Sequence, residues 1–277
     1  MFEERKINPE LLKQYREQGY WKNETLLDCW ERAAAQYPDR EYVVDDRGYR
    51  YTYRELDEAA GRVASYLMEL GIRPGEVVSY QFPIWSEFAM LTIACYKVGA
   101  VAHPIAMSYE EKELARSLNV TESRCYFGPT YFYKTDYEER ILAVRDQTPL
   151  LKDIVLIDRV KPAKSSVRLL REILASYEPL PKEQCVHTKN GQDIAVILCT
   201  SGTTGGTKGV LLSHDNVRFA EEAFNRELGL TKEDIMFMPA PLHHATGFHH
   251  AIIAPMLYGG KVVLQQKYQC RAAIDLM

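Results

Sequence analysis

The sequence lacks the features that would place it in a membrane, a disulfide framework or a metal site. None of its uncharged apolar runs is as long as a membrane span, and the first six residues are largely charged and lack the apolar core of a signal peptide. Six cysteines are scattered along the chain without any C-x-x-C pair, which argues against zinc and against disulfides. We therefore expect a cytoplasmic protein with no metal-ligand set.

The sequence also lacks a large excess of positive or negative charge. The net charge is −4, and lysine and arginine do not cluster, so the electrostatic footprint of a nucleic-acid or anionic-membrane partner is missing. The hydrophobic content of 46% in 277 residues is enough for a substantial core in one large domain or two. A small-molecule partner is favoured, and homo-oligomerisation stays open.

Short apolar runs alternate with stretches of helical spacing through most of the chain. A helix is expected from Thr25 to Pro38, followed by a hairpin at 41–53. The expected strands are 77–82, 100–105, 124–127 and 153–158, and the helices between and after them are 85–98, 109–118, 138–146 and 166–177. This alternation predicts an α/β fold with doubly wound, mostly parallel sheets and flanking helices.

Two helices carry specific local signals. Thr52 and Glu55 have the spacing of a capping box at a helix start. Lys97 stands at the end of the 85–98 helix, next to Gly99, where a solvated lysine would complement the helix dipole. The 85–98 helix is expected to bury one stripe, formed by Phe88, Leu91, Cys95 and Val98.

The most informative stretch is residues 197–210, between apolar runs at 193–199 and 210–212 that predict two buried strands. Glycines allow close approach of a ligand to backbone N–H groups, while hydroxyls and a lysine add further donors for phosphate oxygens. The donor side chains are Thr200, Ser201, Thr203, Thr204, Thr207 and Lys208, and the glycines are Gly202, Gly205, Gly206 and Gly209. The stretch therefore predicts a phosphate loop.

Two other interpretations of this stretch are less favoured. A Walker loop fits Gly202 and Lys208, but Thr207 stands in place of its second glycine and Gly209 in place of its magnesium-binding hydroxyl. A Walker loop also opens a helix, whereas here a strand follows. A plain Ser/Thr/Gly surface turn would not require five hydroxyls and a lysine between two apolar strands.

The segment Thr200 to Gly209 resembles T-S-G-[ST]-T-G-x-P-K-G, the signature of the adenylate-forming (AMP-binding) enzymes, which include acyl-CoA synthetases, peptide-synthetase adenylation domains and luciferases. Thr207 replaces the proline, which should loosen the loop while keeping every donor. The run from Lys97 to Ile105 is similar to the family's K-x-G-A-x-x-x-P-[LI] stretch. Pro241 to Gly247 is similar to its P-L-[FH]-H-x-x-G element, with His243 where an aromatic is commoner.

This resemblance implies ATP as cofactor, with Mg²⁺, and coenzyme A as co-substrate to a small carboxylic acid. It implies catalytic roles for His244, which would border the carboxylate, and for Lys208. Ala245, Thr246 and Gly247 would line the substrate pocket together with His244. The cofactor-binding residues that it implies are Thr200, Ser201, Gly202, Thr203, Thr204, Gly205, Thr207 and Lys208.

The resemblance covers only the front of a family member. We expect an incomplete N-terminal adenylation domain, with residues 1–190 as a first α/β portion and 191–277 as the phosphate loop and the start of a second. The family's Thr-Glu pair that holds magnesium, its hinge and its C-terminal domain with a catalytic lysine have no counterpart here. The isolated chain is therefore expected to be inactive.

Among the family's activities, the wall at residues 245–248 is mostly apolar with one hydroxyl, which favours a ligase of short- or medium-chain fatty acids. An aryl-acid or other adenylate-forming enzyme and a non-catalytic nucleotide-binding module are the alternatives. The four histidines at 243, 244, 249 and 250 are also candidate metal ligands. No pair of them has i, i+4 spacing and no acid lies among them, which argues against a metal site. Cys199 lies beside the loop without a base paired to it in sequence, so a structural role is expected.

Overall fold

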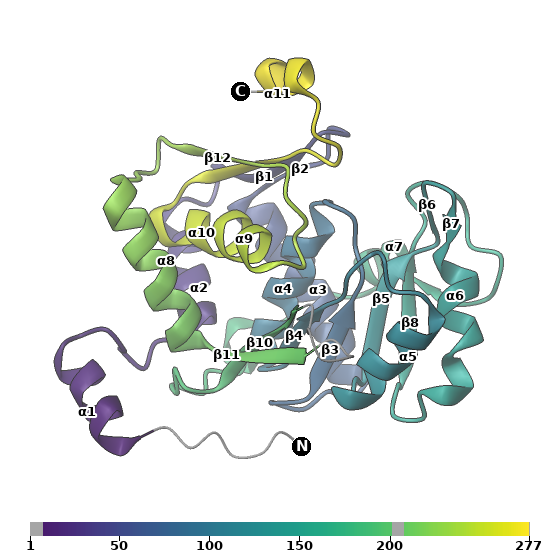
Figure 1. Cartoon of the computed structure of the whole chain (residues 1–277), viewed down its shortest axis with the longest axis horizontal. Coiled ribbons are helices and arrows are strands. Elements are labelled where there is room, and N and C mark those ends of the chain that lie inside the picture. The colour runs from purple at the N-terminus through teal and green to yellow at the C-terminus, as the bar shows by residue number, and fades with distance from the viewer. Residues whose placement is uncertain (1–7, 201–207, 277) are drawn as a thin grey trace.

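The computed structural model describes residues 8–200 and 208–276. Two sheets lie one above the other with helices between and outside them (Figure 1). The α-helices are α1 Pro9–Glu17, α2 Leu26–Gln36, α3 Tyr53–Glu69, α4 Glu87–Lys97, α5 Glu111–Val120, α6 Tyr137–Ala143, α7 Leu170–Ser176, α8 His214–Leu228, α9 Ala245–Gly247, α10 Ala254–Tyr258 and α11 Cys270–Leu276. The shorter helical turns are η1 Arg145–Gln147 and η2 Lys182–Gln184, and η3 Phe248–Ile253 is a π-helix.

The larger sheet has the strand order β11-β10-β4-β3-β5-β8-β9. Its members are β3 Val77–Tyr80, β4 Val101–Pro104, β5 Cys125–Pro129, β8 Asp153–Ile157, β9 Arg168–Leu169, β10 Ile194–Thr200 and β11 Lys208–Ser213. All of its pairings are parallel except β10 with β11. The predicted α/β fold with a doubly wound, mostly parallel sheet is confirmed.

The expectation that both strands flanking the phosphate loop are buried is half wrong. β10 is covered on both faces through its middle, whereas β11 is the edge strand and is exposed over its first three residues. Val210 has 40% of its surface exposed. An edge strand is paired on one side only, and the short apolar run at 210–212 gave no sign of which strand would be at the edge.

The smaller sheet has the order β12-β13-β1-β2, from β12 Ile235–Met238, β13 Lys261–Leu264, β1 Glu41–Asp45 and β2 Arg50–Thr52. β1 pairs in parallel with β13, with Val43 opposite Val262, and the predicted hairpin joins β1 to β2. A third, two-stranded sheet is formed by β6 Tyr131–Phe132 and β7 Thr135–Asp136. Both main sheets therefore take strands from before and after residue 190.

Helix α4 lies in the layer between the two sheets (Figure 1), and every one of its eleven residues is buried. The expectation of a single buried stripe is therefore wrong. A helix covered on all sides is expected to be apolar all round, and α4 follows that pattern apart from Thr92 and the charged residues at its two ends. The predicted capping box at Thr52 and Glu55 starts α3, and Thr25 caps α2.

Lys97 is a second correction, because its side chain is only 2% exposed instead of solvated. Its ammonium lies 2.8 Å from Asp57 Oδ1 on α3, and the indole N–H of Trp30 donates to the same oxygen at 2.7 Å. The layer of α2 and α3 covers the end of α4, so the buried ammonium needs an acid as partner, and the half-buried Asp57 supplies it. The position of Lys97 at a helix end could not show that α2 and α3 would pack over it.

A buried ion network joins the two sheets through Arg159, which follows β8. Its guanidinium donates to Asp45 at the end of β1 at 2.8 Å, to Glu87 at the start of α4 at 2.6 Å and to Ser86 at 2.9 Å. The Arg159 side chain is 4% exposed and also lies over the rings of Tyr49 and Trp85. Burial raises the pKa of Glu87, although Arg159 acts against that rise.

Removing this arginine should be costly. Arg159→Met would leave two carboxylates buried without a counter-charge, and we expect a loss of about 3–5 kcal/mol in the free energy of unfolding. Urea titration followed by circular dichroism measures it. Arg50→Met is the matched control, because the Arg50–Glu41 pair is solvent-exposed and should contribute less than about 1 kcal/mol. Equal losses in the two variants would contradict a structural role for the buried network.

Among the residues that the structure describes, no helix combines the length and the apolar character needed to cross a membrane.

Candidate functional site

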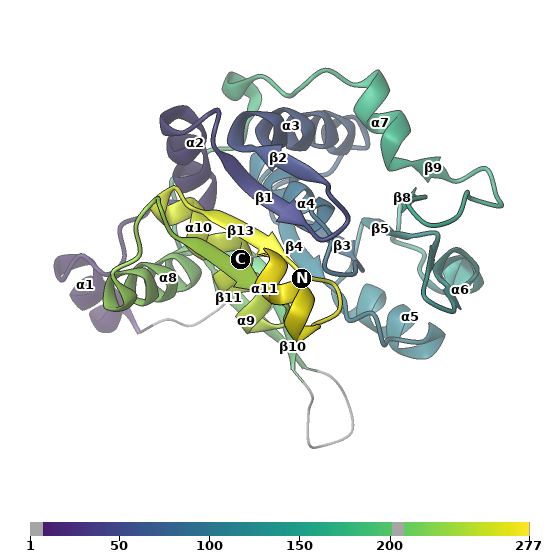
Figure 2. The ribbon, with the colours of Figure 1, turned by 90° about the horizontal axis from the view of Figure 1, so that it is seen from above.

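The two strands that flank the sequence-predicted phosphate loop, β10 and β11, pair with each other in antiparallel register (Figure 2). Thr200 and Lys208 face each other as the last paired residues, and both are exposed. The Thr200 hydroxyl donates to the Lys208 carbonyl oxygen at 3.5 Å. The other predicted phosphate ligands, Ser201, Gly202, Thr203, Thr204, Gly205 and Thr207, lie outside the described residues.

One residue before Thr200, Cys199 has a partner that sequence reasoning missed. Its Sγ lies 3.7 Å from Nε2 of His103 on β4, and Nδ1 of that ring lies 2.7 Å from Ser79 Oγ on β3. Burial lowers the pKa of His103 to about 3 and raises the pKa of the Cys199 thiol. Both groups are therefore neutral at pH 7, so the contact between the imidazole and the thiol generates no thiolate.

The second predicted element begins where β12 ends. His244 is exposed at the N-terminal boundary of α9, and Ala245 and Thr246 are exposed in its first turn. Gly247 is buried, and a Cβ at this position would lie 2.2 Å from the carbonyl oxygen of Pro241. Only glycine fits that close backbone approach.

A helical stretch starts directly after His244, which is the N-cap residue of α9. The Phe248 N–H donates to the His244 carbonyl at 2.8 Å, and α9, η3 and α10 follow one another up to Tyr258. First-turn N–H groups of a helix have no intrahelical acceptor, so those of Ala245, Thr246 and Gly247 point away from the helix body. This end of the helix favours an anion.

His249 and His250 share one acid that lies 28 and 29 residues away in sequence. Their Nδ1 atoms lie 3.1 and 2.9 Å from the two carboxylate oxygens of Glu221 on α8, whose side chain is 2% exposed. Phe224 stacks on His250 with ring centroids 4.1 Å apart. These histidines therefore join α8 to η3. Nothing in the spacing of residues 243–250 could have indicated an acid from another helix.

An apolar cavity of about 380 Å³ opens at the carboxyl edge of β3 and β4, where residues after those strands meet the turn after β12. Phe82, Met107, Leu242 and His243 are among its lining residues, whereas Ala245, Thr246 and Gly247 are not. Burial, followed by the neighbouring His244, lowers the pKa of His243 to about 4. The rule that ligands bind at the carboxyl ends of parallel strands would have pointed to Phe82 and Met107.

A doubly wound sheet with a hydroxyl- and lysine-bearing hairpin at its carboxyl edge has the architecture of α/β proteins that bind ligands at that edge. Comparison with known protein families identifies which family of α/β proteins this chain belongs to. The model of the AMP-binding enzyme family matches residues 30–276. The chain belongs to this family, which confirms the resemblance of its motifs.

Individual relatives agree with this assignment. A medium-chain fatty-acid–CoA ligase of Escherichia coli (strain K12) is 40% identical over 263 residues, which are 95% of this chain and 46% of that protein. A 2,3-dihydroxybenzoate-AMP ligase of Bacillus subtilis (strain 168) is 26% identical over 92% of this chain and 46% of its own length. The chain therefore spans about half the length of the curated relatives it matches.

The fold is also that of solved relatives. The apo structure of Mycobacterium smegmatis MbtA superimposes with a TM-score of 0.86 at 24% identity, over 97% of this chain and 49% of that chain. At this identity the likeness concerns the fold alone. The chain matches the N-terminal half of the adenylate-forming enzyme fold.

The depressed pKa of His243 should be measurable as a pH dependence of stability. The ordinary imidazole pKa is 6.5, so between pH 6.5 and about 4 the unfolded chain binds a proton at this residue that the folded chain does not. Acid therefore destabilises the wild type, by up to about 1 kcal/mol per pH unit at this partly exposed ring. His243→Phe removes that contribution, and its unfolding free energy should fall less steeply in urea titrations from pH 7 to 4. Identical slopes would show that His243 titrates alike in both states.

Proposed function

We propose that the protein of which these residues form part activates a short- or medium-chain fatty acid with ATP and transfers it to coenzyme A. The observation that carries this proposal is the 40% identity to a medium-chain fatty-acid–CoA ligase along 95% of the chain. The hairpin supports it by holding Lys208 opposite Thr200 at the exposed carboxyl edge of the sheet. Residues 1–277 would belong to the N-terminal adenylation domain, with the loop hairpin opening its second portion.

The chemistry needs two displacements. One carboxylate oxygen attacks the α-phosphorus of ATP, and the bond to pyrophosphate breaks. The sulfur of coenzyme A, having lost its proton, then attacks the acyl carbonyl carbon and AMP departs with the electron pair. Both steps require positioned donors for charge that moves onto departing oxygens.

The residues of this chain would take the roles that the resemblance implies. Lys208, Thr200 and the loop donors would hold the β- and γ-phosphates with charge-assisted hydrogen bonds. His244 would border the carboxylate, beside the free first-turn N–H groups of α9, and Ala245 to Gly247 would form the acyl wall. The described residues contain no cluster of three or more acidic, histidine or cysteine side chains that could hold Mg²⁺, so no step is assigned to the metal.

Lys208→Met in the full-length protein should slow fatty-acid-dependent exchange of pyrophosphate into ATP by about 10- to 100-fold, because one charge-assisted bond to phosphate is lost. Lys232→Met is the matched control, since Lys232 is an exposed lysine in a turn and pairs, within the described residues, with its neighbour Glu233. It should keep the wild-type rate. Equal rates for Lys208→Met and the wild type would remove Lys208 from the site.

The same assay decides between the candidate acids. Short- and medium-chain fatty acids should support exchange, whereas exchange with benzoates alone would favour the aryl-acid alternative. Binding of ATP and of an acyl-adenylate analogue in isothermal titration, without exchange for any acid, would indicate a non-catalytic nucleotide-binding module.

Residues 1–277 alone should give no acyl-CoA, because they span about half of the relatives whose names state the activity. Thioester formation with octanoate, ATP and coenzyme A, followed by mass spectrometry, measures it. The full-length protein is the positive control, and turnover by residues 1–277 would contradict this expectation.

A further inference from the structure

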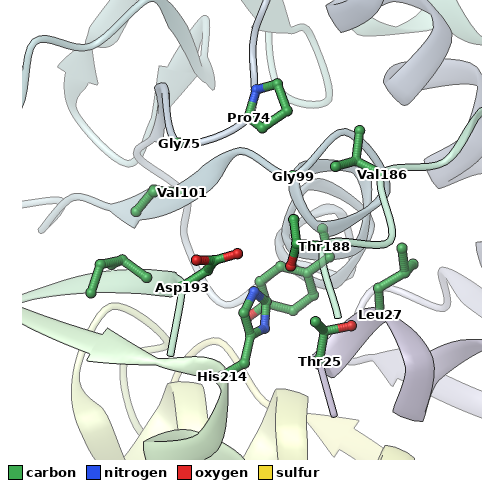
Figure 3. Close-up of a pocket in the computed structure, with 12 residues that line it drawn as sticks. Thr25, Leu27, Pro74, Gly75, Gly99, Val101, Val186, Thr188, Asp193 and His214 are labelled. Carbon is green, nitrogen blue, oxygen red and sulfur yellow. The ribbon is translucent and has the colours of Figure 1, made fainter. Parts of the chain in front are cut away.

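A second cavity, of about 290 Å³, lies at the opposite edge of the larger sheet (Figure 3). Gly75 and Gly99, which precede β3 and β4, contribute to its wall, as do Asp193 and Ile194 at the start of β10. Thr200, from which the sequence-predicted phosphate loop continues, is at the other end of β10. The cavity is therefore separated from the proposed ATP site by the length of that strand.

Most of the wall is hydrocarbon. Leu27 of α2, Val101 of β4 and Val186 of the segment before β10 supply aliphatic side chains, together with Ile194. Engineered apolar cavities of about 150 Å³ hold one benzene molecule. This cavity is thus large enough for a small ring with a short substituent, and too small for a nucleotide.

His214 gives the cavity a neutral polar group. Its Nδ1 accepts a hydrogen bond from the backbone N–H of Leu26 at 3.1 Å. Burial lowers the pKa of His214 to about 4, although Asp28 acts in the opposite direction. The ring is therefore uncharged at pH 7 and carries its one proton on Nε2.

Asp193 supplies a carboxylate to the lining of the cavity. One of its carboxylate oxygens accepts a hydrogen bond from Asn190 Nδ2 at 2.7 Å, and within the described parts of the chain it forms no ion pair. Figure 3 shows its carboxylate pointing toward Thr188 and His214. A carboxylate in a partly enclosed wall favours a cation and repels an anion.

We propose that this cavity binds a small organic ammonium ion, whose charge pairs with Asp193 and whose compact apolar body packs against Leu27, Val101, Val186 and Ile194. The Thr188 hydroxyl lies on the same side as Asp193 and is a further acceptor for the ammonium. ATP, fatty acids and acyl-adenylates are anions, so this site discriminates against every substrate of the proposed ligase reaction. The proposal does not depend on that reaction.

Three probes of nearly the same shape and different charge test it: 2-phenylethylamine, 2-phenylethanol and phenylacetate. The full-length protein is labelled at Ile, Leu and Val methyl groups, and each probe is titrated in turn at pH 7. The amine should shift the methyl signals of Ile194, Val101 and Val186. It should bind about tenfold more tightly than the alcohol, because only the amine gains a charge-assisted hydrogen bond. Phenylacetate should leave these signals unchanged.

Asp193→Asn is the decisive variant, because the amide oxygen can still accept from Asn190 while the charge is lost. Amine affinity should fall about tenfold, to that of the alcohol. Asp146→Asn, at an exposed carboxylate on η1, is the matched control and should bind as the wild type does. Equal affinity for amine and alcohol, an unchanged affinity in Asp193→Asn, or no methyl shift at millimolar amine would each overturn the proposal.

Discussion

The contact on which the arrangement of the two sheets depends is the buried guanidinium of Arg159. It binds Asp45 from the smaller sheet and Glu87 from the helix between the sheets, and it comes itself from the end of a strand of the larger sheet. Charges can be buried only when they are paired, so this contact requires three layers to meet at one place. Ser86, which also contacts the guanidinium, closely follows the cavity residues Phe82 and Ile84. The ion network therefore lies close in sequence to residues that line the cavity at the carboxyl edge.

The two edges of the larger sheet differ in their chemistry. At the carboxyl edge the hairpin presents an exposed lysine and hydroxyl, and the turn after β12 presents the start of a helix, which are donors suited to anions. At the amino edge the lining of the cavity includes the acidic side chain of Asp193. Buried histidines close to both edges, His103 and His214, are kept neutral by burial, so they do not disturb this separation of charge.

Family membership and individual chemistry rest on different residues. The family is defined by motifs that shape the backbone, and Gly247 illustrates this, because any side chain there would overlap the carbonyl of Pro241. Pocket chemistry varies among proteins that share a fold, so residues that shape the backbone do not by themselves select a substrate. In this chain His243, with its lowered pKa, brings a neutral imidazole into a cavity that is otherwise largely apolar.

Local signals in the sequence determined most of the secondary structure and the class of fold. The capping boxes at Thr25 and Thr52, the apolar strands and the glycine-rich hairpin each depend on neighbours within a few residues, so they could be predicted without a tertiary structure. Tertiary structure alone decided which strand is at the sheet edge, that Lys97 is buried against Asp57, and that Cys199 meets His103 and His249 meets Glu221. The physical reason is distance in sequence: these partners come from other strands and helices, and burial and pairing are properties of the layers that fold over a residue.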